Sequence, residues 1–109
     1  DQFVFNTTPG ATNIDNLVQF GVGTDKIVLE NAVFTGLLAT GALTVAQFAL
    51  TGEALTTTDR IIYDQSTGAL FYDRDGSGAA VAVQFANALA GGSAGVGAVG
   101  LSASDFLII

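Results

Sequence analysis

The sequence predicts a mainly β domain, built as an antiparallel β-meander or sandwich with one or two short helical turns. Short runs of β-branched and aromatic residues recur along the chain, and small polar residues and glycine separate them. The stretch "DRIIYDQSTGALFYDRDGSGAAVAVQF" alternates apolar runs with turn residues. Half of the 109 residues are hydrophobic, which is enough to bury one core.

The first strands are expected near the N-terminus. Phe3, Val4 and Phe5 predict a short strand, and residues 6–10, which contain the only proline, predict the turn that ends it. A second apolar run covers residues 17–20, and residues 26–29 predict a third strand.

The middle of the chain predicts three antiparallel strands in a meander. Residues 60–64 and 69–73 flank the turn-prone "QSTG", and residues 79–85 follow "DGSG". The later stretch "ALAGGSAGVGAVG" (residues 88–100) is rich in Gly and Ala and is typical of a flexible loop.

Two octapeptides resemble each other, "LTVAQFAL" (residues 43–50) and "LSASDFLI" (residues 101–108). Thr44 with Gln47 matches a capping box, and Ser102 with Asp105 is a looser version of it. Each copy therefore predicts one helical turn that delivers a Phe to the core and continues as extended chain. We expect Phe106 and the nearby Ile108 to be buried.

Composition excludes several kinds of chemistry. The chain has no Cys and no His, so it has no disulfide, no thiol nucleophile, no Ser-His or Cys-His pair and none of the usual zinc sites. Asp64, Asp73 and Asp75 are conceivable as paired catalytic carboxylates, but turn positions favour solvated structural roles. We expect no enzymatic activity.

The charge balance points to cations as partners. Ten acidic residues against three basic ones give a net charge of −7, which disfavours nucleic acid and anionic membranes. Residues 31–52 and 76–104 lack charge, but polar residues and glycines interrupt both, so no membrane insertion is expected. Calcium, which prefers oxygen ligands, is the metal that suits this composition.

One motif predicts the end of a calcium β-roll. "FGVGTDKIV" (residues 20–28) matches the calcium nonapeptide G-G-x-G-x-D-x-U-x at Gly21, Gly23, Asp25 and Ile27, with Phe20 in place of the first glycine. The glycines would let carbonyls face the ion, and Asp25 would close the site. "DQFV", which begins with Asp1, repeats the second half of the unit, so we expect the chain to begin within a repeat array. An ordinary turn before a strand explains the motif equally well.

A second candidate calcium site is "DRDGSG". Asp73, Asp75, Ser77 and Gly78 occupy positions 1, 3, 5 and 6 of an EF-hand loop. Position 12 is Gln84 instead of Glu, and strands are expected on both sides. A plain Asp-Gly turn is the favoured alternative, and calcium binding here would be weak.

These stretches together resemble the C-terminal domain that follows the calcium repeats of RTX proteins, the hemolysin-type calcium-binding proteins, to which serralysin-type proteases are related. The resemblance covers most of the chain and is carried by "DQFVF", "GVGTDKIVL", "NAVFTGL", the block that begins "DRIIYDQ", and "LSASDFLII".

The resemblance implies export by a bacterial type I secretion system, with an uncleaved C-terminal signal read by an ABC transporter and its membrane-fusion adaptor. The family's acidic residue followed by apolar residues falls on Asp105, Phe106, Leu107, Ile108 and Ile109. The protein would then be secreted or held at the bacterial cell surface, behind an upstream calcium-repeat array of the same chain.

We therefore expect a non-catalytic secretion-signal and folding-cap domain whose folding calcium assists outside the cell. A calcium-dependent adhesin or surface-layer interaction module is the alternative. The single domain, residues 1–109, would comprise a degenerate repeat and β-roll cap (1–30), a short helical turn and connection (31–59), a three-stranded meander (60–87), a Gly/Ala loop (88–100) and the secretion signal with the last strand (101–109).

Overall fold

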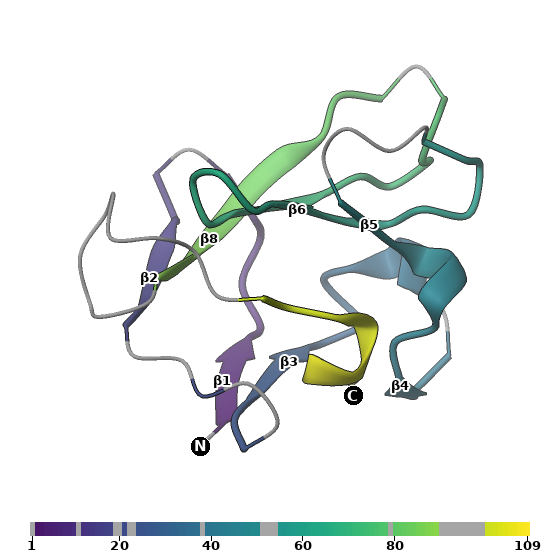
Figure 1. Ribbon diagram of the computed structural model, residues 1–109. Helices are drawn as coiled ribbons and strands as arrows, with labels where there is room; N and C mark the ends of the chain where they lie inside the picture. The colour runs from purple at the N-terminus through teal and green to yellow at the C-terminus, as the bar shows by residue number, and fades with distance from the viewer. Residues whose placement is uncertain are drawn as a thin grey trace.

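The strands of the protein form two mixed sheets with the hydrophobic core between them (Figure 1). A computed structural model describes residues 2–10, 12–18, 21, 24–37, 39–50, 55–78, 80–89 and 100–109. Within these ranges the fold is mainly β, as the sequence predicts, and its only helices are three single 3-10 turns where one or two were expected.

The first sheet contains the chain's last strand in its interior. Its order is β1 (Gln2–Phe5), β3 (Lys26–Leu29), β9 (Phe106–Ile108) and β4 (Gly41–Ala42). The first three strands are parallel to one another, and β4 is antiparallel to β9. In β9 the outer residues of the three are buried and the middle one is half-buried, the alternation expected of a strand with one face on a core.

The second sheet has the order β2 (Asp15–Val18), β8 (Val83–Leu89), β7 (Ala69–Tyr72), β6 (Ile61–Asp64) and β5 (Phe48–Leu50). Its three middle strands pair antiparallel, whereas the outer strands β2 and β5 pair parallel to their neighbours. The turn between β6 and β7 is the predicted "QSTG", with Gly68 at a φ of 83°, a conformation that favours glycine.

The predicted bounds of one strand in this sheet are wrong. Residues 79–85 were expected to form it, but the strand runs from Val83 to Leu89 and takes in the start of the predicted Gly/Ala loop. The preceding loop is longer than a tight turn because the Ala80 N–H donates to the Asp75 carboxylate, 3.0 Å away, and holds the chain out of the sheet. Residues 90–99 of the predicted loop lie outside the described residues.

The two similar octapeptides form similar local structures. Each has a 3-10 turn, η2 (Val45–Gln47) or η4 (Ala103–Asp105), that leads directly into a strand, β5 or β9. A capping box precedes each turn, with N-cap residues Thr44 and Ser102. The prediction of a capped turn followed by extended chain is confirmed for both copies.

Aromatic rings join the two sheets through the core. Phe5 of the first sheet meets Phe85 of the second edge-to-face, with ring centroids 5.1 Å apart. Phe34, in the connection before η1 (Thr35–Leu37), contacts Phe85 and Tyr72, with centroids 5.3 Å and 5.1 Å away. Such edge-to-face pairs contribute about 0.5–1.5 kcal/mol each beyond the area they bury. The core therefore couples the N-terminal strand to the meander.

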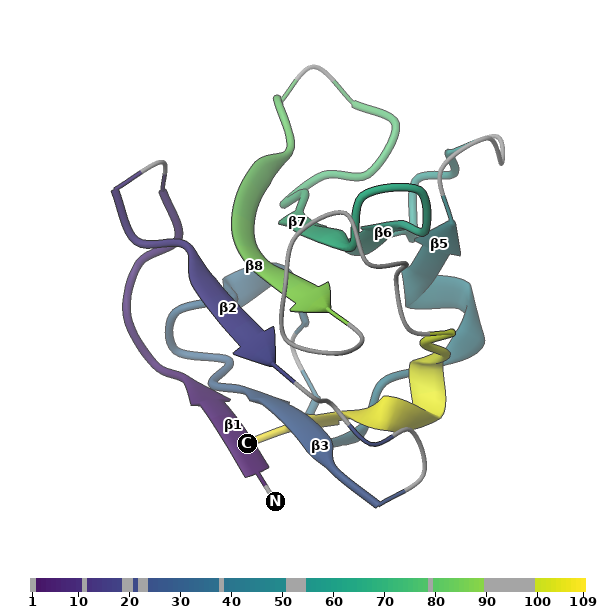
Figure 2. The ribbon, with the colours of Figure 1, turned by 60° about the vertical axis from the view of Figure 1, so that its left-hand side comes forward.

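The two sides of the molecule differ in how the sheets end. β1 and β2 are the outermost strands of the two sheets on one side, and Figures 1 and 2 show them beside each other. On the opposite side the outermost strands are the short β4 and β5, next to the 3-10 turns η1 and η2. Only the β1 and β2 side presents two strand edges without an adjoining helical turn in the described chain.

Candidate functional site

The predicted secretion signal is built into the centre of the first sheet. β9 lies between β3 and β4, with Phe106 opposite Ile27 and Ile108 opposite Leu29. Phe106 is 1% exposed and Ile108 is 2% exposed, so the prediction that both are buried is confirmed. Backbone hydrogen bonds also hold Ile109, which donates to Leu29 and accepts from Asn31.

The acidic residue of this segment is buried as well. Asp105 is 2% exposed, and its Oδ2 accepts hydrogen bonds from the backbone N–H (2.9 Å) and hydroxyl (3.4 Å) of Ser102. Lys26 donates to the carbonyl of Ser104 and ties the same turn to β3. In the folded domain, a receptor could therefore reach little of the predicted signal apart from Ile109, which is 47% exposed.

The nonapeptide-like motif forms a closed turn. The Asp25 carboxylate accepts the Gly21 N–H at 2.8 Å, and the Gly21 carbonyl accepts N–H groups from Thr24 and Asp25. The Asp25 carboxylate and the Gly21 carbonyl therefore both accept hydrogen bonds from N–H groups of the same turn. Ile27 is fully buried in β3, as the motif predicts. Asp1, Phe20 and Gly23 lie outside the described residues.

The "DRDGSG" loop brings two of its predicted ligands together. Asp73 is buried, and its Oδ1 accepts the Asp75 N–H at 3.2 Å. Burial raises the pKa of Asp73, and the negative charge of the neighbouring Asp75 raises it further. The hydrogen bond from the Ala80 N–H lowers the pKa of Asp75. Oδ1 of Asp75 is buried and has no hydrogen-bond partner. The third predicted ligand, Ser77, is exposed.

The remaining glycines of this loop have a packing role. Gly76 adopts a φ of 66°, and a side chain there would collide with the Thr56 carbonyl. A Cβ at Gly78 would collide with the Asp75 carboxylate. Close approach of backbone to backbone and to a carboxylate thus explains both glycines.

The third carboxylate considered for catalysis is used in a different turn. Asp64 accepts hydrogen bonds from the backbone N–H (3.0 Å) and hydroxyl (2.6 Å) of Ser66, which lower the pKa of Asp64. It helps to form the turn between β6 and β7. In the described ranges, no three acidic side chains gather in a way that could hold a metal ion.

A cavity of about 450 Å³ lies elsewhere, on the side of β4 and β5. No local pattern in the sequence predicts this cavity, because residues 36–47 form it together with Thr58 and Arg60. Gln47 was singled out only as a capping residue, and Arg60 only as the start of a strand. No local pattern signals that these two side chains line one hollow.

Comparison with known proteins finds no match to a protein-family model, to a curated protein or to a solved structure. No helix in the described part of the chain is both long and apolar enough to cross a membrane.

Proposed function

We propose that this chain is a non-catalytic C-terminal domain of the RTX type, which carries the type I secretion signal and caps the end of a calcium β-roll. The observation that carries the proposal is the path of the first three strands. β1 and β3 pair in parallel, while β2, between them in sequence, belongs to the opposite sheet. One coil of a two-sheet solenoid would follow this path.

A preceding coil would extend both sheets at once. Its two strands would pair with the outer edges of β1 and β2, which lie on the same side of the molecule (Figure 2). At the opposite side, the turns η1 and η2 adjoin the short edge strands, an arrangement that discourages further pairing. The upstream calcium-repeat array of the same chain is the partner that suits this geometry.

The burial of β9 implies an order of events. A transporter and its adaptor could read Asp105 and the four apolar residues after it only before the domain folds, because folding buries most of them. Export as an unfolded chain, followed by folding outside the cell, meets this requirement. The same five residues would then complete the first sheet.

Calcium would be held, within this proposal, by Asp73 and Asp75. The buried Oδ1 of Asp75 is an oxygen donor with no other partner, and a cation would also relieve the repulsion between the two carboxylates. Asp25 is the weaker candidate because the Gly21 N–H already occupies its carboxylate. Calcium bound only by the folded state would stabilise the fold by mass action outside the cell.

Export is tested by attaching the chain behind a reporter in bacteria that carry a type I secretion system. Deletion of residues 105–109 should abolish secretion of the reporter. Phe48→Ala is the matched control, because it truncates the equivalent Phe of the other copy and leaves the last five residues intact. Secretion of the deletion variant at the parent level, or equal loss in the control, would contradict the proposal.

Calcium binding is tested separately by titration calorimetry of the folded chain. Heat of binding should be present in the parent and in Asp25→Asn, and should be lost in Asp75→Asn. Absence of heat in the parent removes calcium from this domain but leaves the export proposal standing. Loss in Asp25→Asn alone would transfer the site to the first motif.

A further inference from the structure

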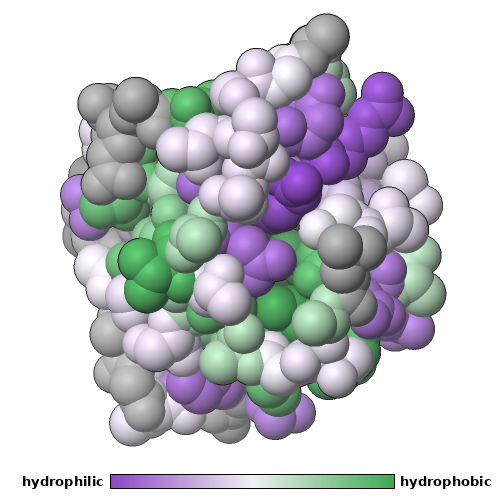
Figure 3. Space-filling model, turned by 90° about the vertical axis from the view of Figure 1, so that its right-hand side faces the viewer, coloured by the Kyte–Doolittle hydropathy of each residue, from purple (hydrophilic) through white to green (hydrophobic). Residues whose placement is uncertain are grey.

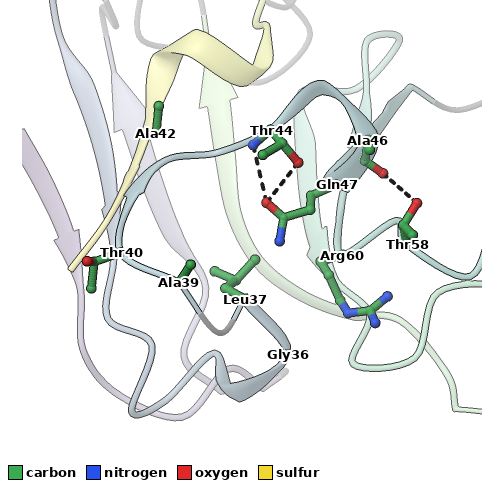
Figure 4. Close-up of a pocket in the computed structure, with 10 residues that line it drawn as sticks. All are labelled: Gly36, Leu37, Ala39, Thr40, Ala42, Thr44, Ala46, Gln47, Thr58 and Arg60. Carbon is green, nitrogen blue, oxygen red and sulfur yellow. Dashed lines mark hydrogen bonds between the residues drawn. The ribbon is translucent and has the colours of Figure 1, made fainter.

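The cavity on the β4 and β5 side lies between two parts of the chain: residues 36–47, which include η1, β4 and η2, and the pair Thr58 and Arg60 just before β6. Its volume of about 450 Å³ is in the range of small-molecule sites, roughly 300–1,000 Å³. Figure 3 shows this side of the molecule, where a hydrophobic area borders a hydrophilic band. The lining residues are Gly36, Leu37, Ala39, Thr40, Ala42, Thr44, Ala46, Gln47, Thr58 and Arg60 (Figure 4).

The charge of this lining is opposite to that of the chain. The net charge is −7, with three basic residues in all, yet the described lining residues include Arg60 and no acidic residue. The described wall therefore carries a fixed positive charge, and the long-range field of the acidic surface is screened beyond about 8 Å at physiological salt. The cavity selects for a ligand that accepts hydrogen bonds.

The amide of Gln47 supplies one donor. Its Oε1 accepts hydrogen bonds from the N–H (3.2 Å) and the hydroxyl (3.1 Å) of Thr44. This fixes the amide so that Nε2 points into the space between Leu37 and Arg60 (Figure 4). Nε2 has no hydrogen-bond partner among the described residues, so its N–H groups are available.

Arg60 supplies the cationic donor. Nη1 donates to the carbonyls of Thr57 (2.7 Å) and Asp59 (2.9 Å), which hold the guanidinium at the edge of the cavity while its aliphatic stem forms part of the wall. No described carboxylate forms an ion pair with it. Nε is buried and lacks an acceptor. The positive charge is thus held in place, and it lies close enough to Asp75 to lower the pKa of that carboxyl.

Apart from Gly36 and three threonines, the rest of the described wall is aliphatic. Leu37 is buried, and the side chains of Ala39, Ala42 and Ala46 are too small to fill the space in front of it. None of the described lining residues is aromatic, so they offer no platform on which a sugar or a base could stack. A short alkyl chain is the body that this wall would accommodate.

We propose that the cavity binds a small aliphatic monocarboxylate. The carboxylate would accept hydrogen bonds from Gln47 Nε2 and from Nη2 of Arg60, and the alkyl chain would lie against Leu37 and the three alanines. This inference is independent of export and of calcium binding. Hexanoate, with eight heavy atoms, should bind with a dissociation constant of about 1 mM.

The test is a titration of the ¹⁵N-labelled chain with sodium hexanoate, followed by amide chemical shifts. Saturable shifts should be confined to residues 36–47 and 57–60, and hexanamide should bind about tenfold more weakly because it lacks the charge. Arg60→Gln should weaken hexanoate about tenfold or more, whereas Arg74→Gln, a matched loss of one positive charge outside the cavity, should bind like the parent.

A second variant, which places a larger side chain in the cavity, tests the proposal if Arg60→Gln fails to fold. Ala46 is exposed, so Ala46→Leu should fold and should block the cavity with Arg60 intact, again with at least a tenfold loss of binding. Shifts that do not saturate, equal binding of hexanoate and hexanamide, parent-like binding by Ala46→Leu, or equal weakening by Arg60→Gln and Arg74→Gln would each overturn the proposal.

Discussion

The two octapeptide copies, residues 43–50 and 101–108, share a local structure and differ in burial. Each has a capping box, a 3-10 turn and a strand. In the first copy, Val45 is 84% exposed and Phe48 is half-buried. At the matching positions of the second copy, Ala103 is 6% exposed and Phe106 is 1% exposed. Equal local structure therefore does not mean equal contribution to stability.

The difference follows from where each strand lies in its sheet. β5 is an edge strand that pairs with β6 alone in the described chain, whereas β9 is enclosed by β3 and β4. The two copies touch through their Phe rings, with the centroids of Phe48 and Phe106 5.6 Å apart. The first copy thus covers part of the second. This comparison predicts a consistent asymmetry between matched substitutions.

The largest asymmetry is expected at the two phenylalanines. Phe106→Ala should lower the free energy of unfolding by about 3–5 kcal/mol, as for a buried Phe. Phe48→Ala should lower it by about 1–2 kcal/mol, because part of its surface is already in water. Urea unfolding measures both. The double variant should lose about 0.5–1.5 kcal/mol less than the sum, since the ring contact can be lost only once.

The capping side chains should show the same asymmetry on a smaller scale. Asp105→Ala removes the acceptor of the Ser102 N–H together with a side chain that is only 2% exposed, which should cost about 2 kcal/mol. Gln47→Ala removes the equivalent acceptor from Thr44, but the Gln47 side chain is only half-buried, so the cost should be about 0.5 kcal/mol. Asp105→Asn keeps an acceptor oxygen and is the control. Equal losses at Asp105 and Gln47 would contradict the comparison.

Local features of this fold were predictable from sequence, and features made by tertiary contact were not. The capped turns, the β6–β7 turn and the strand at residues 26–29 depend on residues close in the chain. The start of β8 was misplaced because the bond between Ala80 and Asp75 is a loop contact with no periodic signature. The cavity at Arg60 was missed because its wall comes from separate segments.

Alkaline pH should lower the free energy of unfolding through Tyr63, which lies in β6, the strand that pairs with the first copy. Tyr63, opposite Leu50 in the β5–β6 pair, is fully buried, and burial together with the charge of Asp64 raises the pKa of Tyr63 to about 12. In the unfolded chain the phenol ionises near pH 10. The folded state therefore holds a proton that the unfolded state has lost, so stability is complete below pH 10 and falls as the pH rises toward 12.

The expected loss is about 1–2 kcal/mol, less than the full shift implies, because solvent screens Asp64. Urea unfolding at pH 9 and pH 11.5 measures it, and Tyr63→Phe should remove that part of the pH dependence. An identical decline in the parent and in Tyr63→Phe would assign the loss to other groups.

The smallest effects are expected at the first residue of each 3-10 turn, where the two copies differ most in exposure. Val45→Ala should change the free energy of unfolding by less than about 0.5 kcal/mol, since the side chain is mostly in solvent. Ala103→Val should cost about 1 kcal/mol, because two extra methyl groups must enter a packed site beside β9. Thermal and urea unfolding of the two variants make the comparison direct. A larger loss for Val45→Ala than for Ala103→Val would contradict the comparison. Position in the sheet would then not explain the difference in stability between the two copies.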